Sequence, residues 1–301
     1  MLLALKIDVD TYRGTREGIP PLVAALQRHQ AGATFLWSLG PDHTGRAIKR
    51  VFRPGFLSKV SRTSVVEHYG IRTLLYGTLL PGPDIGRRCA AQMRAVRDAG
   101  FECGIHTYDH IKWQDYVASK DQAWTLRELE RARLRYQEIF GEPPKTHGAA
   151  GWQMNSHAYR WEETVKLDYA SDGRGTHPFW PVVDGQRLNC PQLPTTLPTL
   201  DELIGVDGLT PENVHEHLLG LTADAPAHGH VYTLHAELEG MRLLPTFERL
   251  LAGWRRQGYQ LVSTRRLFEQ LDLARLPEHG VEMGEIPGRS GTLALQGKVR
   301  G

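Results

Sequence analysis

The stretch that decides the fold is the N-terminal run LLALKIDVD, residues 2–10. Apart from Lys6, its first six residues are apolar, and the run has the length of a buried β-strand. It ends in Asp8 and Asp10, and because side chains alternate along a strand, both carboxylates point to the same face. Two carboxylates this close repel one another unless a cation or a proton lies between them. A solvated strand end would also explain the pair of carboxylates. Other motifs in the sequence are needed to distinguish a cation site from a solvated strand end.

Downstream of this run, short β-rich segments alternate with longer stretches of helical periodicity. The alternation predicts an α/β fold with parallel strands and right-handed crossovers. A closed or distorted β/α barrel is favoured over an open doubly wound sheet, and such barrels carry their working residues at the carboxyl ends of the strands. We predict strands at residues 2–7, 33–39, 101–105, 146–150, 168–171, 187–190, 230–234 and 260–263, and helices at 17–30, 84–99, 123–140, 211–223 and 245–257.

Two histidine motifs also follow predicted strands. His106 and His110, in the sequence HTYDH, come directly after the strand at 101–105, and their spacing can bring two imidazoles onto one face of a helical turn. His235 ends the strand at 230–234. A single histidine is often a structural residue, but here three motifs end strands of one predicted barrel. We therefore expect them to meet at its edge.

The residue types at this edge suit a catalytic metal centre. One carboxylate oxygen from Asp10 and two imidazole nitrogens from His106 and His110 leave coordination positions open for water and substrate. Imidazole ligands favour one divalent ion of zinc, manganese or cobalt over magnesium. The second carboxylate, Asp8, can take a proton from the water, and His235 can protonate a leaving amine.

These motifs, in this order, resemble those of the polysaccharide deacetylase (NodB-homology) superfamily. The resemblance implies a distorted (β/α)7 barrel as the catalytic domain over residues 1–275, and we expect an irregular tail over 276–301. It also implies Asp8 as the base, Asp10 as a metal ligand and His235 as the acid. The family's Arg-x-Pro-Tyr segment is replaced here by HGAAGWQ, beginning at His147. The arginine that holds the base is therefore absent, and Arg174 or another group is expected to take its place.

Longer segments narrow the resemblance within this superfamily. IDVDTYRGTREG, GIHTYDHIKWQ, HGAAGWQMN, ASDGRG and TLHAELEGM are similar to segments of deformylases that act on undecaprenyl-phosphate-linked 4-deoxy-4-formamido-L-arabinose in lipid A modification. The similarity implies a metal-dependent deformylase that acts on this polyprenyl-phosphate-linked amino sugar and contributes to resistance to cationic peptides. It also indicates four substrate-binding residues: Trp152, Asp172, Arg174 and Glu237.

A basic insertion at about residues 43–66 supports a lipid-linked substrate. It contains six basic residues and no acidic one, and apolar residues recur at helical spacing on both sides of Pro54 and Gly55. Such a pattern is typical of amphipathic helices that lie on anionic lipid. A solvated loop or a helix packed on the barrel is the alternative. We predict contacts with the membrane or with lipid phosphate at Arg46, Lys49, Arg50 and Arg53.

Composition sets the remaining limits. The formal net charge of +2 creates no field that would select nucleic acid, and the three cysteines are too few for a disulfide framework. We find no signal-peptide pattern and no run of about 18 apolar residues, so we expect a peripheral protein on the cytoplasmic face of the bacterial inner membrane. The alternatives are a deacetylase of another amino sugar and a non-catalytic barrel that binds sugar or lipid.

Overall fold

The N-terminal strand β1 (Leu2–Val9) lies inside a parallel sheet, with strands paired along both of its edges, in the computed structural model, which describes residues 1–47, 70–289 and 291–300. Strand β2 (Thr34–Ser38) pairs with its carboxyl-terminal half, and β8 (His230–His235) pairs along its other edge. From its second to its eighth residue the strand is buried, as expected for a strand covered on both faces.

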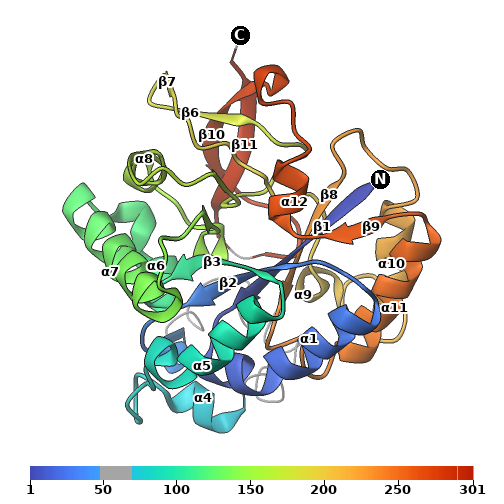
Figure 1. Cartoon of the computed structure of the whole chain (residues 1–301), viewed down its shortest axis with the longest axis horizontal. Helices are drawn as coiled ribbons and strands as arrows, with labels where there is room; N and C mark the ends of the chain where they lie inside the picture. Colours follow the sequence, from blue (N-terminus) through green and yellow to red (C-terminus); the bar gives the residue numbers. More distant parts are fainter. Residues whose placement is uncertain (48–69, 290, 301) are drawn as a thin grey trace.

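The sheet curls into the predicted distorted barrel (Figure 1). Its strands run in the order β5-β4-β3-β2-β1-β8, and β9 (Gln260–Val262) pairs with the first residues of β1. The gap between β5 and β8 is bridged by an extended segment, since Leu193 donates to the Ala170 carbonyl and Thr196 to that of Val231. The other strands are β3 (Glu102–Thr107), β4 (Thr146–His147) and β5 (Tyr169–Ala170).

Helices cover the outside of the barrel and close its hydrophobic core. Helix α5 (Ile85–Asp98) packs on the barrel through one apolar face. Its buried apolar residues recur every three or four positions: Ile85, Cys89, Met93 and Val96. The other helices are η1 (Gly14–Gly18), α1 (Ile19–Arg28), α4 (Ile71–Leu75), α6 (His110–Tyr116), η3 (Val117–Ser119), α7 (Gln122–Phe140), η4 (Ala150–Trp152), α8 (Ser156–Thr164), α9 (Leu200–Leu203), α10 (Val214–Leu221), α11 (Leu244–Arg256), α12 (Thr264–Phe268) and η5 (Leu273–Arg275).

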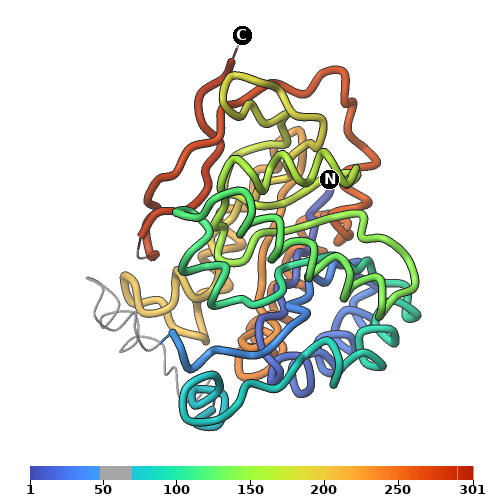
Figure 2. The backbone as a smooth tube through the Cα atoms, turned by 90° about the vertical axis from the view of Figure 1, so that its left-hand side faces the viewer, coloured from blue at the N-terminus to red at the C-terminus, as the bar shows by residue number. Residues whose placement is uncertain are grey.

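Two β-strands form within residues 278–299, which corrects the expectation of an irregular tail over 276–301. Strands β10 (Glu278–Gly284) and β11 (Leu293–Val299) pair with one another and, through β10, with β6 (Trp180–Val183). Strand β7 (Gln186–Arg187) completes this second sheet. Leu293 and Ala294 are buried in it, and Ala294 belongs to the main hydrophobic core, so the tail packs on the barrel. Figure 2 shows this hairpin in red along one side of the molecule.

A second correction concerns residues 187–190, which were expected to form a strand of the barrel. Strand β7 ends at Arg187 and lies in the small sheet, where both of its residues are exposed. The barrel edge beside β5 is filled instead by the extended segment around Leu193. Within the described ranges, none of the helices has both the length and the apolar character that a membrane span requires.

Candidate metal centre and catalytic site

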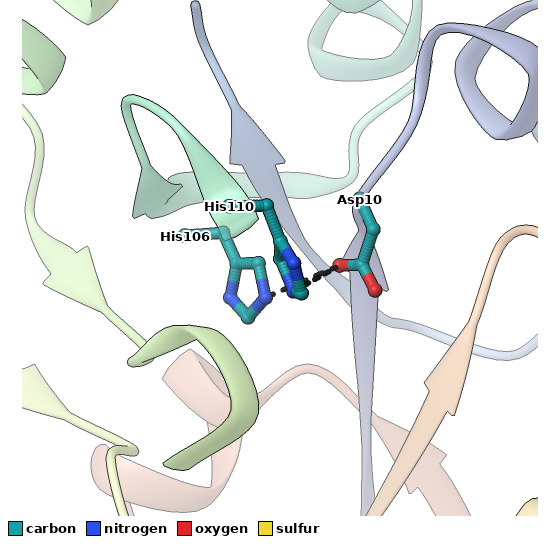
Figure 3. Close-up of side chains that lie close together, drawn as sticks. All are labelled: Asp10, His106 and His110. Atoms are coloured by element: carbon teal, nitrogen blue, oxygen red, sulfur yellow. Dashed lines mark ion pairs between the residues drawn. The ribbon is translucent and has the colours of Figure 1, made fainter. Parts of the chain in front are cut away.

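Three side chains converge at the carboxyl ends of β1 and β3 (Figure 3). Asp10 directly follows β1, His106 lies near the end of β3, and His110 is the first residue of α6. The Asp10 Oδ1 atom is 3.2 Å from His106 Nε2 and 3.4 Å from His110 Nε2. One ligand atom from each residue lies within 4.8 Å of the others, which is close enough for all three to bind one ion.

The two histidines meet across a strand–helix junction and not along one helical turn. Asp109 caps α6, because its side chain accepts a hydrogen bond of 3.1 Å from the Lys112 backbone N–H. The helix therefore begins at His110, while His106 still belongs to the strand. Their ring centroids are 5.3 Å apart. The spacing predicted the proximity of the rings, although the local structure that produces it differs.

Hydrogen bonding shows that these residues fit a metal cation. His106 Nδ1 is 2.6 Å from the Gly148 carbonyl oxygen. A carbonyl only accepts, so Nδ1 carries the proton and the Nε2 lone pair of the neutral ring faces Asp10. Among the described residues, Asp10 Oδ1 has no hydrogen-bond donor although it is buried. A proton on Nε2 or a metal cation must therefore lie between this nitrogen and the anionic oxygen of Asp10.

The same groups keep Asp10 ionised. Burial acts to raise the pKa of Asp10, but the neighbouring His110 and His106 outweigh it and hold the pKa well below its ordinary value. An ionised carboxylate and two imidazoles are the donor set that zinc, manganese or cobalt accepts.

Asp8 lies beside this triad, and the buried side chain of Lys6 lies close to it. Its Oδ1 atom is 3.8 Å from His106 Nδ1 and 4.0 Å from Lys6 Nζ, and it accepts no hydrogen bond from the part of the chain described here. Lys6 is 1% exposed and donates a 2.7 Å hydrogen bond to the Ser171 carbonyl. Burial lowers the pKa of Lys6, while the carboxylate of Asp8 acts to raise it.

Our sequence analysis missed Lys6 as a site residue. Its signal was present, because a lysine inside an otherwise apolar strand, two residues before Asp8, must share the face of both acids. Arg174, which was expected to replace the family arginine, instead donates 2.7 and 3.0 Å hydrogen bonds to the two Glu202 carboxylate oxygens. The cation within 4.0 Å of Asp8 is therefore Lys6.

His235 lies next to Asp8 on the neighbouring strand. The two residues are register partners in the parallel pairing of β1 with β8. His235 Nδ1 is buried and has no hydrogen-bond partner among the residues that the structure describes. Burial acts to lower the pKa of His235, but Asp201, Asp10 and other nearby carboxylates raise it. Asp201 was not among the predicted site residues, although it lies in the segment PQLPTTLPTLDE, residues 191–202, which also resembles the deformylases.

Glu237 supports the turn that carries the metal ligand. Its Oε1 atom accepts hydrogen bonds from the backbone N–H groups of Asp10, at 3.1 Å, and Thr11, at 2.8 Å. A Cβ atom at Gly14 would lie 1.9 Å from this oxygen, so the turn requires glycine there. Burial and the Asp10 carboxylate raise the pKa of Glu237 to about 8. Because Glu237 is only 1% exposed, we assign it to the turn and not to substrate contact.

Trp152 forms a buried platform for three cations. Its indole N–H lies 3.2 Å from Thr195 Oγ1, and the side chain is 1% exposed. Lys6 Nζ, Arg174 Cζ and Arg289 Cζ lie 5.6, 5.1 and 4.2 Å from the ring centroid. Arg289 comes from the segment between β10 and β11, so the tail takes part in the site.

Asp172 belongs to a fully buried network around His147. The His147 Nδ1 atom is 2.9 Å from Asp172 Oδ1 and 2.7 Å from Glu162 Oε1, and Gln192 donates to Asp172 at 2.8 Å. Burial acts to lower the pKa of His147, but Asp172 and Glu162 raise it to about 10. These three residues have ligand spacing, and the Asp172 carboxylate is engaged by His147 and Gln192 within this network. The substrate contact expected of Asp172 stays a prediction.

Of the predicted lipid contacts, only Arg46 lies within the described residues. Its Nε atom donates a 3.0 Å hydrogen bond to the Gly77 carbonyl. Lys49, Arg50 and Arg53 lie outside the described residues.

Solved structures with similar folds define the class of protein. The chain resembles a polysaccharide deacetylase from Mycobacterium smegmatis with a TM-score of 0.63 and 17% identity, over 95% of this chain and 94% of that one. It also resembles a family 4 acetyl xylan esterase from Clostridium thermocellum in complex with a cobalt ion, with a TM-score of 0.51 and 12% identity over 89% and 91% of the two chains. The fold is thus that of the polysaccharide deacetylases. No model of a known protein family matches the chain.

Curated relatives identify the family more narrowly. The chain is 36% identical over 297 residues to the "Probable 4-deoxy-4-formamido-L-arabinose-phosphoundecaprenol deformylase ArnD" of Shewanella sediminis, which covers 99% of this chain and 95% of the relative. It is 29% identical over 287 residues to the protein of the same name from Wigglesworthia glossinidia brevipalpis, over 95% and 99% of the two chains. The chain belongs to this deformylase family.

The buried histidine network generates a prediction about stability. Because the pKa of His147 rises from 6.5 to about 10 on folding, the folded chain keeps a proton that the unfolded chain releases. This contribution is complete below about pH 6.5 and is lost as the pH rises to about 10, by up to about 1.4 kcal/mol per pH unit. In urea unfolding, the stability gap between wild type and His147→Gln should narrow as the pH rises. A gap that stays constant over this range would contradict the assignment.

Proposed function

We propose that this protein is a metal-dependent deformylase. It hydrolyses the formamide of undecaprenyl-phosphate-linked 4-deoxy-4-formamido-L-arabinose to formate and the free amine, a step of lipid A aminoarabinose modification and of resistance to cationic peptides such as polymyxin. The observation that carries the proposal is the Asp10, His106 and His110 triad, with Asp8 and His235 beside it, in a chain of this deformylase family. A site for binding alone would not need a base and an acid next to three metal ligands.

The roles of the catalytic residues follow from where their side chains lie. A divalent ion held by Asp10, His106 and His110 would polarise the formamide carbonyl and lower the pKa of the attacking water. Asp8 accepts the proton that this water loses as its oxygen bonds to the formyl carbon. His235 donates a proton to the amide nitrogen as the C–N bond breaks, so the amine leaves neutral and formate remains.

Neighbouring charges prepare Asp8 and His235 for opposite roles. Lys6 Nζ lies 4.0 Å from Asp8 Oδ1, so a lysine stands beside the proposed base. Asp201 and Asp10 raise the pKa of His235, which favours the protonated form that an acid requires.

The direct test follows the fate of the formyl group. Purified protein is incubated with the lipid-linked formamido sugar, and the mass of the sugar and the release of formate are measured. We expect loss of one formyl group with stoichiometric formate, and little reaction with the N-acetyl analogue. Hydrolysis of the acetyl analogue at an equal rate would favour a general amino-sugar deacetylase instead.

Removing a metal ligand should remove one ion and the activity together. His110→Ala should lower bound cobalt by one ion per chain, measured by elemental analysis after equilibrium dialysis, and should abolish formate release. Circular dichroism checks that the variant is folded. Treating the wild type with a chelator and then restoring cobalt supplies the matched control, since activity should disappear and return. Full activity in chelated His110→Ala protein would refute the metal-dependent reaction.

Removing the base or the acid should leave the ion in place. Asp8→Asn and His235→Ala should each keep the cobalt content of the wild type while kcat falls by roughly 10²–10⁴. Loss of the ion in Asp8→Asn would make Asp8 a ligand and would place the base elsewhere. Lys6→Met should lower kcat less than Asp8→Asn does, because it removes a neighbour of the base and leaves the base itself in place.

We further propose that the enzyme works on the cytoplasmic face of the inner membrane as a peripheral protein. Charge supports this proposal, because residues 43–66 contain six basic and no acidic residues. Apolar exposure next to the insertion supports it too: Ile71, at the start of α4, is 69% exposed, and Leu79 is 81% exposed. Exposed apolar groups beside a basic segment are typical of surfaces that dip into the headgroup region of anionic lipid.

Vesicle binding tests the membrane proposal. Replacing Lys49, Arg50 and Arg53 with Glu should weaken binding to anionic vesicles, and high salt should do the same to the wild type. Turnover of a water-soluble formamido-sugar analogue should be unchanged, because the catalytic side chains belong to the barrel.

A charge-matched control comes from α11. Replacing its three arginines, Arg249, Arg255 and Arg256, with Glu changes the net charge by the same amount at another place on the surface. This variant should bind vesicles like the wild type. Equal weakening by both triple variants would show that net charge, and not a docking segment, controls binding.

A further inference from the structure

A second group of histidines lies at the small sheet. His177 precedes β6, His279 lies on β10, and His228 precedes β8. The His177 ring centroid is 5.0 Å from that of His279 and 6.1 Å from that of His228. His228 precedes the amino end of β8, whereas His235 lies at its carboxyl end, so this group is about 20 Å along the strand from the catalytic edge.

The closest approach in this group joins two imidazole nitrogens. His177 Nε2 and His279 Nε2 are 3.2 Å apart. His279 Nδ1 is 2.8 Å from the Gly297 carbonyl oxygen, which only accepts, so Nδ1 carries the proton. In the neutral ring, the Nε2 atom of His279 therefore presents a lone pair to His177. His106 is held in the same way by the Gly148 carbonyl in the catalytic site.

The neighbours of His177 give its ring the same arrangement. The Thr176 backbone N–H donates to Gln296 Oε1 at 2.8 Å, which orients the amide. The Gln296 Nε2 group, 3.2 Å from His177 Nε2, must then donate to it. The Thr176 hydroxyl donates to Gln296 Oε1 at 3.2 Å, so it accepts from His177 Nδ1 at 2.8 Å. His177 Nε2 thus also carries a lone pair and no proton.

Two lone pairs at 3.2 Å repel unless a proton or a metal cation lies between them. A proton would place an imidazolium among other histidines. The hydrogen bonds to Gly297 and Thr176 hold the two Nδ1 protons away from this gap, so both Nε2 lone pairs face a position that a cation can occupy.

The separation of the nitrogens matches a shared metal ion. Two imidazole nitrogens at about 2.0–2.1 Å from one tetrahedral ion lie about 3.4 Å apart. The observed 3.2 Å is close to this value, and it equals the distance between His106 Nε2 and Asp10 Oδ1 in the catalytic triad.

We propose that His177 and His279 form a second binding site for a divalent transition-metal ion of the zinc class, with His228 as a third ligand. His228 is exposed, so its ring can turn toward the ion. On binding, Gln296 gives up its hydrogen bond to His177 Nε2, and solvent completes the coordination. The site does not depend on the proposed deformylase activity, because its ligands lie about 20 Å along β8 from the catalytic edge and none of them belongs to the catalytic triad.

An ion at this site would join the tail to the barrel. It would connect β10 with the loops before β6 and β8, which are far apart in the sequence. The hairpin that β10 begins also carries Arg289, whose Nε atom is 3.1 Å from Glu202 Oε1. The expected consequence is a more stable tail, not a new reaction.

Metal stoichiometry tests this proposal. Metal-free full-length protein is equilibrated with zinc and dialysed, and bound zinc is measured by elemental analysis. We expect two ions per chain in the wild type, one in His279→Ala, one in His110→Ala and none in the double variant. If His279→Ala fails to fold, bound zinc is measured instead in His177→Ala, which changes a less buried residue. One ion per chain is expected there too.

The matched control is His217→Ala, which removes an exposed histidine of α10. It should retain two ions. One ion in the wild type, lost in His110→Ala and kept in His279→Ala, would overturn the proposal and leave a shared proton between the rings. Zinc should also raise the melting temperature of His110→Ala and leave that of the double variant unchanged.

Discussion

The burial of three charged groups along one face of β1 is the constraint on which the site depends. Lys6, Asp8 and Asp10 follow one another at every second position of a strand that is covered on both sides. A buried charge is costly unless an opposite charge or a set of hydrogen-bond donors lies close to it. Strand β3 and helix α6 therefore bring two imidazoles to Asp10. Lys6, on β1 itself, lies beside Asp8.

Residues that surround these charged groups hold them in place. Glu237 accepts hydrogen bonds from the turn that carries Asp10, and Trp152 lies beneath Lys6. Arg289 reaches the same tryptophan from the tail, so residues close in space come from opposite ends of the chain. These contacts explain why several polar residues of the resembling segments are buried. Their side chains hold Asp8, Asp10 and the two histidines in place, and so fix the distance between the candidate metal ligands and the proposed base.

Sequence reasoning located the candidate ligands because they lie at the end of a strand or within a few residues after it. Parallel strands bring their carboxyl ends to one edge, so Asp10, His106 and His235 could be placed together from spacing alone. The strands themselves were predicted where they are long and apolar, as in β1, β2 and β8. The helix α5 was predicted for the same reason, since its buried positions recur with helical period.

The errors arose where long-range pairing outweighs local pattern. The tail is rich in glycine and has weak strand propensity, yet β10 pairs with β6 almost 100 residues earlier. Burial of Asp172 could not be predicted, because it depends on His147 and Glu162, which come from other elements. Lys6 was overlooked although its position in the strand places it beside Asp8. A charged residue inside a buried strand is a signal that deserves the same weight as a motif.

The most direct measurement of the central claim is the anomalous scattering of cobalt in crystals of the protein. The account predicts a peak at about 2.0–2.3 Å from Asp10 Oδ1, His106 Nε2 and His110 Nε2, with Asp8 outside the coordination shell. A peak bridging Asp8 and Asp10 with neither histidine bound, or no peak at the end of β1, would contradict it.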